Sequence, residues 1–451
     1  MTFDVIIIGS GQAGVPLATR LAGAGKRVLL AERGELGGTC VNTGCTPTKT
    51  LVASARAAHV ARTAGRLGVK VSSVEVDFAA VIDRKDAIVK RWREGTAKRV
   101  QADRLTVARG HARFIGERKI EVAGETHDAE TVIVDTGARS VTPSIAGLEE
   151  TPFLNNRGIM NLRELPSHLI VLGGGYIGCE LGQMFRRFGA KVTIVERSKH
   201  LLSREDPEVS SALEEVFRNE GIDLELEAKV ARVSSGIQVR LASGKELRGS
   251  HLLVATGRRP NTDDLGCDKG NIALNDKGFI VAGDDYATSS KGVYAVGDVI
   301  GGPQFTHTSW DDHRLLFDLL QGRSRRGRGG RFIPYTVFTD PQVAGVGLTE
   351  REAREQNIPF EAASMPFGSV ARAVEVDETA GIMKLLIDPK TERLLGATIV
   401  GAEAGELIHI FVALMQAGAG ARAIVDAQFV HPTFAEGVQS AVMKLPRFAL
   451  H

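Results

Sequence analysis

The sequence predicts an α/β fold with two similar βαβ units and a C-terminal domain of α+β type. Two observations support this prediction. A glycine-rich turn stands between a short apolar run and a helical pattern twice, at residues 9–14 and 173–178. From about residue 331 onward, short alternating strands mix with a helix and no such turn recurs. The 451 residues are enough for about three domains.

The composition is that of a globular protein. Hydrophobic residues make up 43% of the chain and charged residues 24%, which excludes wholesale disorder. The 56 basic and 54 acidic residues leave a net charge of +2, so no strong field favours nucleic acid or an anionic membrane as a partner. Because the first residues lack a basic region and a long apolar run, we expect a cytoplasmic protein without a membrane anchor.

The first βαβ unit predicts a dinucleotide site. Residues 3–8 form a short strand, 13–24 a helix and 26–32 a second strand. In the turn, Gly9 permits the tight bend, Gly11 lets the backbone approach a pyrophosphate, and Gly14 lets helix and strand pack closely. The helix N-terminus favours phosphate, and Glu32, which ends the second strand, can bind ribose hydroxyls.

The second unit repeats this pattern. Strands are predicted at residues 169–172 and 192–196, with Gly173, Gly175 and Gly178 in the turn between the first strand and a helix. A single motif of this kind is weak, because many glycine turns bind nothing. Both copies, however, stand between strand and helix with an acid about 20 residues on, here Glu32 and Glu196. We therefore expect two dinucleotides.

Two cysteines carry the strongest chemical signal. Cys40 and Cys45 follow the first βαβ unit, and the apolar residues after Pro47 predict a helix through this region. A helix N-terminus favours the thiolate form of a nearby cysteine. Zinc needs four ligands and no further CxxC or HxxxH pattern supplies them, so we expect a redox-active pair and no metal site.

A second candidate group lies near the C-terminus. His431 precedes Glu436 by five residues, with Pro432 between them as a turn signal. A carboxylate in contact with an imidazole fixes its tautomer and raises its basicity, as in an acid/base dyad. Alone, this pair would be read as solvated surface residues. Together with the cysteine pair, it indicates catalysis.

Several segments occur in the order typical of one family. They are GGTCVNTGCTPTK at residues 37–49, the two glycine turns, Ala255-Thr256-Gly257-Arg258, Gly297-Asp298 and HPTFAE at residues 431–436. Over nearly its whole length the chain thus resembles the class I pyridine nucleotide-disulfide oxidoreductases, the family of dihydrolipoamide dehydrogenase, glutathione reductase and mercuric reductase.

The resemblance implies a domain order and a homodimer. A Rossmann-like FAD-binding domain would comprise residues 1–145 and 263–330, with a Rossmann-like NAD(P)-binding domain at residues 146–262 between its two parts. The α+β domain at residues 331–451 would be the dimerisation domain.

The resemblance also implies catalytic roles. Cys45 would be the charge-transfer thiol nearer the flavin, and Cys40 would be the interchange thiol that attacks the substrate disulfide. His431 and Glu436 would come from the partner subunit and handle the proton. Electrons would pass from the nicotinamide through FAD to the cysteine pair and on to an external disulfide.

Further residues would hold the cofactors. Glu32 would bind the adenosine ribose and Asp298 the ribityl chain, while Lys49 would lie by the flavin and pair with Glu180. A helix starting near Thr308 would direct its N-terminus at the flavin pyrimidine. The remaining cofactor contacts that the resemblance implies are Thr39, Gly137 and Gly257.

The choice between NADH and NADPH depends on the acid that ends the second strand of the second βαβ unit. The Glu196 carboxylate can accept from a free 2′-hydroxyl and repels a 2′-phosphate, which favours NADH. Arg197 and Lys199 follow directly and weaken this preference, so NADPH remains possible.

The motifs that carry the resemblance are shared by enzymes with different substrates. Thr43, Thr46, Thr48 and residues 304–312 resemble mercuric reductases. Those enzymes, however, end in a vicinal cysteine pair and have Tyr in place of the dyad His, whereas residues 445–451 contain no cysteine and His431 is present. We therefore expect an FAD-dependent NAD(P)H:disulfide oxidoreductase similar to dihydrolipoamide dehydrogenase. A mercuric reductase-like metal-ion reductase and an NADH oxidase or quinone reductase are the alternatives.

An arginine-rich segment separates the last two predicted domains. It contains Arg323, Arg325, Arg326, Arg328 and Arg331 among interspersed glycines. We expect a solvated, flexible linker loop, and an anion-binding patch is the alternative.

Overall fold

The computed structural model describes residues 2–324 and 326–449, which fold into two compact units. The first unit comprises Met1–Thr50, Ile82–Val141 and Gly257–Arg331. The second comprises Leu51–Val81, Thr142–Thr256 and Phe332–His451. The finer four-part division predicted from the sequence remains a prediction.

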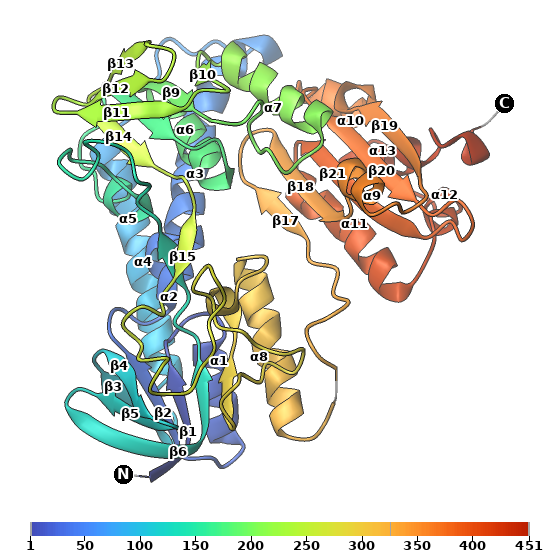
Figure 1. Cartoon of the computed structure of the whole chain (residues 1–451). Coiled ribbons are helices and arrows are strands. Elements are labelled where there is room, and N and C mark those ends of the chain that lie inside the picture. The colour runs from blue at the N-terminus through green and yellow to red at the C-terminus, as the bar shows by residue number, and fades with distance from the viewer. Residues whose placement is uncertain (1, 325, 450–451) are drawn as a thin grey trace. The chain divides into compact units, whose positions relative to one another are not determined.

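The first unit is built on a seven-stranded sheet in the order β3-β2-β1-β6-β5-β4, with β16 also paired to β6 (Figure 1). Its strands β1, β2, β3, β6 and β16 are parallel, and β4 and β5 form an antiparallel extension beside β6. The strands are β1 (Thr2–Ile8), β2 (Val28–Glu32), β3 (Leu105–Arg109), β4 (Ala112–Gly116), β5 (Lys119–Val122), β6 (Glu125–Val134) and β16 (Val293–Ala295).

The apolar run of β1 is explained by its central place in this sheet. Ile6, Ile7 and Ile8 are buried, because both faces of a parallel sheet are covered. On one face, helix α1 (Gly14–Gly23) lies beside α8 (Thr306–Leu320), and its buried Leu17 and Leu21 join a core with Ile7 (Figure 1). The predicted first βαβ unit is therefore present.

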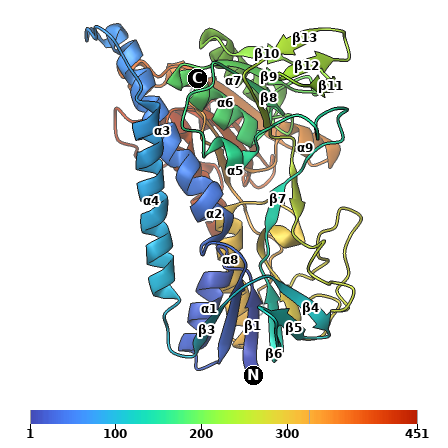
Figure 2. The ribbon, with the colours of Figure 1, turned by 90° about the vertical axis from the view of Figure 1, so that its left-hand side faces the viewer.

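The thiol segment follows β2 as two consecutive helices, α2 (Gly38–Thr43) and α3 (Cys45–Thr63). The first turns of α3 lie beside α4 (Phe78–Arg99), where Arg84 donates a hydrogen bond to the Thr50 carbonyl at 2.9 Å (Figure 2). The other elements of the unit are the paired strands β7 (Ala138–Ser140) and β15 (Arg258–Pro260) and the 3₁₀ helix Gly297–Ile300. Within the described chain, none of the helices is both long and apolar enough to cross a membrane.

The second unit contains the second βαβ unit. Its parallel sheet has the order β10-β9-β8-β14, formed by β8 (His168–Leu172), β9 (Lys191–Val195), β10 (Asp223–Glu225) and β14 (His251–Val254). Helix α6 (Tyr176–Phe188) connects β8 to β9, and α7 (Pro207–Asn219) connects β9 to β10. The remaining elements are α5 (Asn156–Ile159), the short 3₁₀ helix Ala64–Leu67 and an antiparallel sheet of β11 (Val230–Ser234), β12 (Gln238–Leu241) and β13 (Glu246–Arg248).

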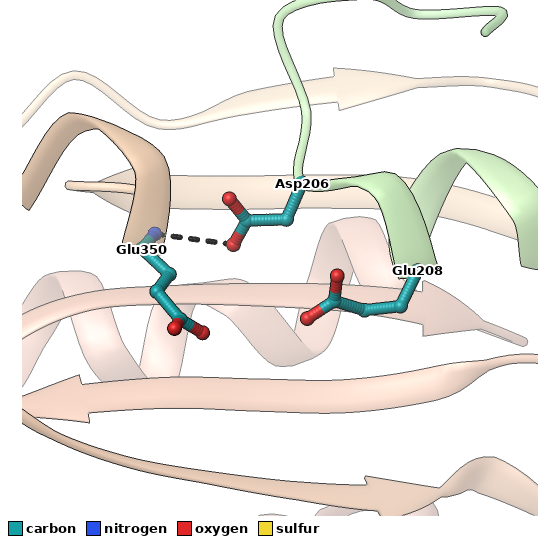
Figure 3. Close-up of side chains that lie close together, drawn as sticks. All are labelled: Asp206, Glu208 and Glu350. Carbon is teal, nitrogen blue, oxygen red and sulfur yellow. Dashed lines mark hydrogen bonds between the residues drawn. The ribbon is translucent and has the colours of Figure 1, made fainter. Parts of the chain in front are cut away.

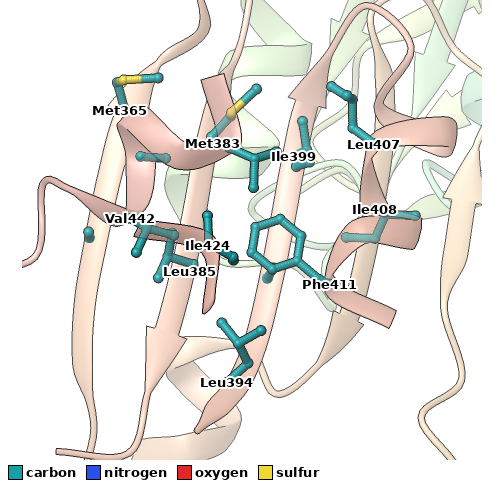
Figure 4. Packing of buried hydrophobic residues seen from close by; sticks show 14 of the residues in the cluster. Met365, Met383, Leu385, Leu394, Ile399, Leu407, Ile408, Phe411, Ile424 and Val442 are labelled. Carbon is teal, nitrogen blue, oxygen red and sulfur yellow. The ribbon is translucent and has the colours of Figure 1, made fainter. Parts of the chain in front are cut away.

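The C-terminal part of this unit is an antiparallel sheet in the order β17-β18-β21-β20-β19. Its strands are β17 (Tyr335–Val337), β18 (Gln342–Gly347), β19 (Glu361–Pro366), β20 (Ile382–Ile387) and β21 (Leu394–Gly401). The helices are α9 (Glu350–Glu355), α10 (Ala371–Glu375), α11 (Ala404–Ala417), α12 (Arg422–Val425) and α13 (Phe434–Val442), with 3₁₀ turns at Phe367–Ser369 and Pro446–Phe448. Leu385, Ile399, Ile408 and Phe411 lie in the core between sheet and helices (Figure 4). This is the α+β domain that the sequence predicts.

The prediction that the arginine-rich segment is a solvated linker is wrong for its last residue, Arg331. The Arg331 side chain is 9% exposed and pairs with Asp312 at 2.9 Å and Asp311 at 3.2 Å. Arg328 donates to the carbonyl of Ala282. The segment is therefore fastened to the first unit by buried charge pairs, which sequence spacing could not indicate. Arg325 lies outside the described residues.

Two glycines of α1 allow a matched test of the dinucleotide turn. A Cβ on Gly14 would lie 2.1 Å from the Gly9 carbonyl oxygen, whereas a Cβ on Gly23 would meet nothing within 4 Å. We expect Gly14→Ala to lower the free energy of unfolding by about 1–3 kcal/mol through overpacking. Gly23→Ala should leave it unchanged or raise it by up to about 1 kcal/mol. Urea unfolding of both variants measures the difference, and equal effects would contradict the close packing.

Candidate active site

The first glycine turn is shaped by contact with the end of β6. Gly9 has φ +106°, and a Cβ there would lie 2.2 Å from the Asp135 carbonyl oxygen. The Gly14 N–H donates to the Asp135 carboxylate at 2.7 Å, and a Cβ on Gly11 would lie 2.7 Å from the same carboxylate. Asp135 is buried, and this burial raises the pKa of its carboxyl although the Gly14 bond opposes the rise. Gly9 and Gly14 are thus required by backbone packing, and Gly11 leaves room for the Asp135 carboxylate.

The thiol segment is attached directly to this turn. A Cβ on Gly38, the first residue of α2, would lie 2.9 Å from the Gly11 Cα, and the Gly37 N–H donates to the Ser10 carbonyl at 3.1 Å. The Asn42 side chain closes α2 by donating to the Gly38 carbonyl at 2.8 Å. The dinucleotide turn and the cysteine helix therefore form one rigid piece of backbone.

The structure brings Cys40 and Cys45 together. Cys40 lies in α2, and Cys45 is the first residue of the 19-residue helix α3. Gly44 makes the break between the two helices, because a Cβ there would lie 2.9 Å from the Thr39 carbonyl oxygen. Both cysteines are free thiols here, Cys45 exposed and Cys40 half-buried. A helix N-terminus at Cys45 stabilises negative charge on its sulfur.

The two sulfurs are electrostatically unequal. The hydrogen bond with Cys45 is the largest effect on the Cys40 thiol and raises its pKa, and burial raises it further. The Cys45 sulfur also lies 3.1 Å from the Thr306 hydroxyl oxygen at the start of α8. Cys40 therefore holds its proton more tightly than a free cysteine does.

Asp298 lies in the 3₁₀ helix after β16. Its carboxylate accepts from Arg258 at 3.3 Å, and Arg258 also donates to the Ala138 carbonyl at 2.7 Å. Burial raises the pKa of the Asp298 carboxyl, while the charge of Arg258 opposes the rise. Gly137 and Gly257, the other predicted contacts near this position, have φ +68° and +143°, which glycine adopts without strain.

The Glu32 carboxylate accepts hydrogen bonds from the first glycine turn. One carboxylate oxygen accepts from the Ser10 N–H at 3.0 Å and the Ser10 hydroxyl at 2.7 Å, and the other accepts from the Gly34 N–H at 2.7 Å. The carboxylate therefore lies beside the glycine turn at the end of β2. A turn with glycine at residues 9, 11 and 14 before α1, with an acid at its side, fits a dinucleotide cofactor.

The second turn has the same construction. Gly173 has φ +107° and a Cβ there would lie 2.6 Å from the Ala255 carbonyl oxygen, and a Cβ on Gly178 would lie 1.9 Å from the Gly173 carbonyl oxygen. Gly175 has open space around its Cβ position and directly precedes α6. Glu196 accepts from the Gly174 N–H at 2.6 Å and the Ser198 N–H at 2.8 Å. This turn also fits a dinucleotide.

One face of α6 is bonded to the chain segment at residues 335–340. Tyr176 stacks on Tyr335 with ring centroids 5.8 Å apart, and the buried Glu180 accepts from the Phe338 N–H at 2.7 Å. Further along, Arg187 donates to the Asp340 carboxylate at 2.5 Å. Glu180 thus helps to fix the nucleotide helix to the C-terminal domain. The predicted pairing of Glu180 with Lys49, in the first turns of α3, remains a prediction.

The predicted dyad is formed within the chain. The His431 Nδ1 lies 2.9 Å from a Glu436 carboxylate oxygen, with the His431 side chain 71% exposed and that of Glu436 19% exposed. Thr433 caps α13 by accepting from the Glu436 N–H at 3.2 Å, so that Glu436 is held in the first turn of the helix. The imidazole is therefore oriented from one side and presented outward on the other.

Sequence reasoning missed Asp135, Arg258 as the partner of Asp298, and Thr306. Asp135 directly follows the apolar residues Val132, Ile133 and Val134 and precedes Gly137, which is a readable signal. The other two could not be found from spacing, because their partners lie 40 and 261 residues away along the chain. The two remaining cysteines are buried: Cys179 donates to the Gly174 carbonyl at 3.3 Å and Cys267 to the Thr262 carbonyl at 3.9 Å.

A cluster of carboxylates lies elsewhere in the second unit. The side chains of Asp206, Glu208 and Glu350 face one another, and the Glu350 N–H donates to Asp206 (Figure 3). The Lys384 ammonium, 4% exposed, lies 2.9 Å from Asp206 and 2.7 Å from Glu350 and also contacts Glu208. The cluster therefore already contains its cation and joins α7, α9 and β20.

Comparison with known families agrees with this geometry. The sequence pattern of the pyridine nucleotide-disulphide oxidoreductase family matches residues 3–312, and that of the dimerisation domain of the same family matches residues 333–442. The chain belongs to the pyridine nucleotide-disulphide oxidoreductases.

Individual relatives cover nearly the whole chain. A probable pyridine nucleotide-disulfide oxidoreductase, RclA of Escherichia coli, is 36% identical over 97% of this chain and 98% of its own length. A dihydrolipoyl dehydrogenase of Thermus scotoductus is 34% identical over 100% and 99%, and a mercuric reductase of Staphylococcus aureus is 33% identical over 98% and 82%. The solved structure of the HOCl-induced flavoprotein disulfide reductase RclA from Escherichia coli superimposes with a TM-score of 0.89, at 36% identity over 97% of this chain and 99% of that chain.

These matches confirm the predicted family, fold class and enzyme class. The chain is a flavoprotein pyridine nucleotide-disulfide oxidoreductase that uses FAD and NAD(P)H. The match to the dimerisation domain supports a homodimer.

The cluster around Lys384 gives a stability prediction. Lys384→Met leaves the buried Asp206 carboxylate without its cation and should lower the free energy of unfolding by about 3 kcal/mol at neutral pH. Burial opposes charge on Asp206, but bonds from Lys384 and two backbone N–H groups outweigh it and lower the pKa of Asp206; the Lys384 bond lowers the pKa of Glu350. A lowered folded-state pKa stabilises the protein above the unfolded pKa, and this stabilisation is lost in acid.

The measurement is the thermal midpoint of both proteins between pH 4 and 8. The difference between wild type and Lys384→Met should be largest near neutral pH and should shrink toward pH 4 as the carboxylates bind protons. Lys390→Met, at an exposed position after the same strand, is the control and should show no such pH dependence. A difference independent of pH would contradict this account of the cluster.

Proposed function

We propose that this enzyme reduces an external disulfide through the pair Cys40 and Cys45, in the manner of a dihydrolipoamide dehydrogenase. The observation that carries the proposal is the position of the two thiols. They are hydrogen-bonded to each other and packed against the first glycine turn through Gly37 and Gly38, with Cys40 half-buried and Cys45 exposed. A structural thiol pair would not need such an attachment to a cofactor-binding loop.

The residues around the first turn would hold FAD. Gly9, Gly11 and Gly14 would admit the pyrophosphate, with Glu32 near the ribose and Asp298 near the ribityl chain. Thr39, Lys49, Gly137 and Gly257 complete this proposed set. When bound, FAD supplies the transfer of an electron pair from reduced nicotinamide to protein sulfur.

The proposed sulfur chemistry proceeds in two exchange steps. Two electrons and two protons convert the Cys40–Cys45 disulfide to the dithiol. Cys40 must lose its proton to attack one sulfur of the substrate, which forms a mixed disulfide and releases a substrate thiolate. Cys45 then attacks Cys40, so the second substrate thiol leaves and the internal disulfide forms again.

Because the pKa of Cys40 is raised, we propose that the His431–Glu436 dyad removes its proton. A thiol that holds its proton tightly needs a base to become a nucleophile, and the same base then protonates the leaving thiolate. We propose that His431 of the partner subunit supplies this base, with Glu436 fixing its Nδ1 at 2.9 Å. The exposed imidazole supports an action on another chain, so each site would be complete only in the dimer.

We further propose that the second turn, with Gly173, Gly175 and Gly178, binds the nicotinamide dinucleotide, and that NADH is preferred over NADPH. Glu196 lies at the end of β9 with both carboxylate oxygens held by backbone N–H groups. A 2′-phosphate near this fixed negative charge would be repelled. We keep the cytoplasm as the proposed compartment.

A second candidate function is the reduction of a thiophilic metal ion. The RclA protein from Escherichia coli has also been solved as a Cu(II) complex, at 36% identity to this chain. The Cys40–Cys45 dithiol can pass one electron to each of two Cu(II) ions, lose its two protons and become the internal disulfide, which balances the reaction. Soft thiolates favour copper and mercuric ions as ligands.

The cysteine pair is tested by Cys40→Ser and Cys45→Ser. With NADH and with NADPH as donors, each variant should reduce lipoamide and glutathione disulfide at least about a thousandfold more slowly than the wild type, because neither variant can form the internal disulfide. Cys267→Ala, at a buried site away from the pair, is the control and should keep its activity. Lipoamide turnover that survives both serine variants would overturn the thiol mechanism. Faster turnover of Cu(II) or mercuric ion than of any disulfide would favour the second candidate.

The dyad is tested by the pH profile of His431→Ala. At pH 7 the variant should turn over disulfide about 10²–10⁴-fold more slowly, while nicotinamide oxidation in a single turnover stays near the wild-type rate. Because the pKa of Cys40 is raised, its thiolate becomes more abundant as the pH rises, so the variant should recover activity toward high pH. A loss that is equal in both half-reactions, or independent of pH, would contradict the assigned role.

A further inference from the structure

The backbone turn that carries Asp298 is bonded to a buried carboxylate. Gly297, the residue before Asp298, has φ +71° and donates its N–H to the Asp312 Oδ2 at 2.9 Å. A Cβ on Gly297 would lie 2.9 Å from the Asp135 Oδ1 and 2.9 Å from the Ser309 Oγ. The turn therefore lies in a tightly filled space between the end of β6 and helix α8, and Asp312 fixes its amide.

Asp312 is buried and accepts from three donors. Its side chain is 2% exposed. The Oδ1 atom accepts from the hydroxyl of the fully buried Tyr286 at 2.9 Å and from the Arg331 Nη1 at 2.9 Å, while Oδ2 accepts from the Gly297 N–H. A carboxylate so far removed from water stays ionised when a cation and several donors replace its lost hydration.

Arg331 supplies this cation. Its Nη1 also lies 3.2 Å from the Asp311 carboxylate, and its Nε donates to the Arg328 carbonyl at 2.8 Å. Burial opposes charge on Arg331, but Tyr286, Asp311 and Asp312 outweigh it and raise the pKa of the guanidinium. The side chain is therefore held in one place and remains charged beside Asp312.

The cation comes from the end of the arginine-rich segment. Arg331 is the last residue of the first unit, and Phe332 begins the final part of the second. Arg331 and Asp312 are 19 positions apart in the chain. Arg328, in the same segment, donates to the neutral carbonyl of Ala282 at 3.0 Å. Two arginines of one segment are thus both anchored, and of these two Arg331 contacts Asp312.

We infer that Arg331 is a positioning residue for FAD, which acts through Asp312 and Gly297 to fix the turn that presents Asp298 to the cofactor. The inference deepens the proposed function and rests on it, because it assumes the proposed place of Asp298 near the ribityl chain. Without Arg331, the bond to Gly297 would depend on an unpaired buried charge. The turn that presents Asp298 would then be held less firmly, and FAD would be released faster.

The test measures the rate at which the holoenzyme releases FAD. Free FAD is separated by ultrafiltration at successive times after dilution and quantified by its fluorescence. Arg331→Met removes the cation and keeps a long side chain. Because a hydrogen bond to a charged group is lost, the variant should release FAD about tenfold faster than the wild type. Arg331→Gln takes its place, with the same expected and contrary outcomes, if Arg331→Met does not fold.

Two control variants separate positioning from a general loss of stability. Arg328→Met removes the neighbouring anchor of the segment but no contact with Asp312, and its release rate should stay within about twofold of the wild type. Lys384→Met lowers the stability of the second unit, as the thermal midpoint will show, and should also leave the release rate unchanged. Equal acceleration in Arg331→Met and in either control would overturn the inference.

A double variant tests the route through the carboxylate. Asp312→Asn combined with Arg331→Met removes the buried charge together with its cation. The double variant should release FAD more slowly than Arg331→Met alone, because no unpaired charge remains and the asparagine oxygen can still accept from Gly297. A double variant that releases FAD as fast as Arg331→Met, or faster, would overturn the role of the charge pair.

Asp298→Ala in the same assay distinguishes this inference from the proposed function. It should release FAD at least about tenfold faster than the wild type, and adding Arg331→Met should then change the rate by no more than about twofold, because both act at one turn. If Asp298→Ala accelerates release and folded Arg331→Met does not, the inference fails and the proposed place of Asp298 stands. If Asp298→Ala leaves the release rate unchanged, that proposed place fails and the inference fails with it. The thiol mechanism fails separately, when Cys40→Ser and Cys45→Ser both retain disulfide turnover.

Discussion

Close contact between backbone segments without side chains is the constraint on which the rest of the site depends. Gly9 and Gly14 let β1, the start of α1 and the end of β6 meet at Asp135, and Gly38 brings the thiol helix onto Gly11. A methyl group at any of these positions would occupy space that another backbone atom already fills. The distance between the first glycine turn and the cysteines is therefore set by van der Waals contact, which suits the proposed relay of electrons.

The chemistry is divided between two thiols by their surroundings. Cys40 is half-buried and donates to Cys45, while Cys45 is exposed at the meeting point of two helix N-termini. This asymmetry supports the proposed role of an external base at Cys40. It also connects the thiol pair to His431, whose outward ring nitrogen and fixed Nδ1 suit a base acting across a subunit boundary.

Much of this organisation could be predicted from local pattern. The glycine turns, the cysteine spacing and the dyad are short-range features, and each occupies fewer than about 20 residues. The expectation that Arg331 is solvated is wrong because it depends on long-range packing. Arg331 pairs with Asp311 and Asp312, whose positions relative to it depend on how α8 packs. Similarly, the bond between Arg258 and Asp298 joins β15 to the 3₁₀ helix after β16 and leaves no periodic signal.

The two βαβ units, the cysteine pair and the family can be read from the sequence alone, because these depend on residue types at fixed spacing within one local element. The long-range partners of each group emerge only in the folded chain: Asp135 under the first turn, Thr306 at Cys45, and Lys384 among three acids. The physical reason is that hydrogen bonds and charge pairs act over a few ångströms in space. Their partners can stand anywhere along the chain, so their identity is settled only when the strands and helices pack.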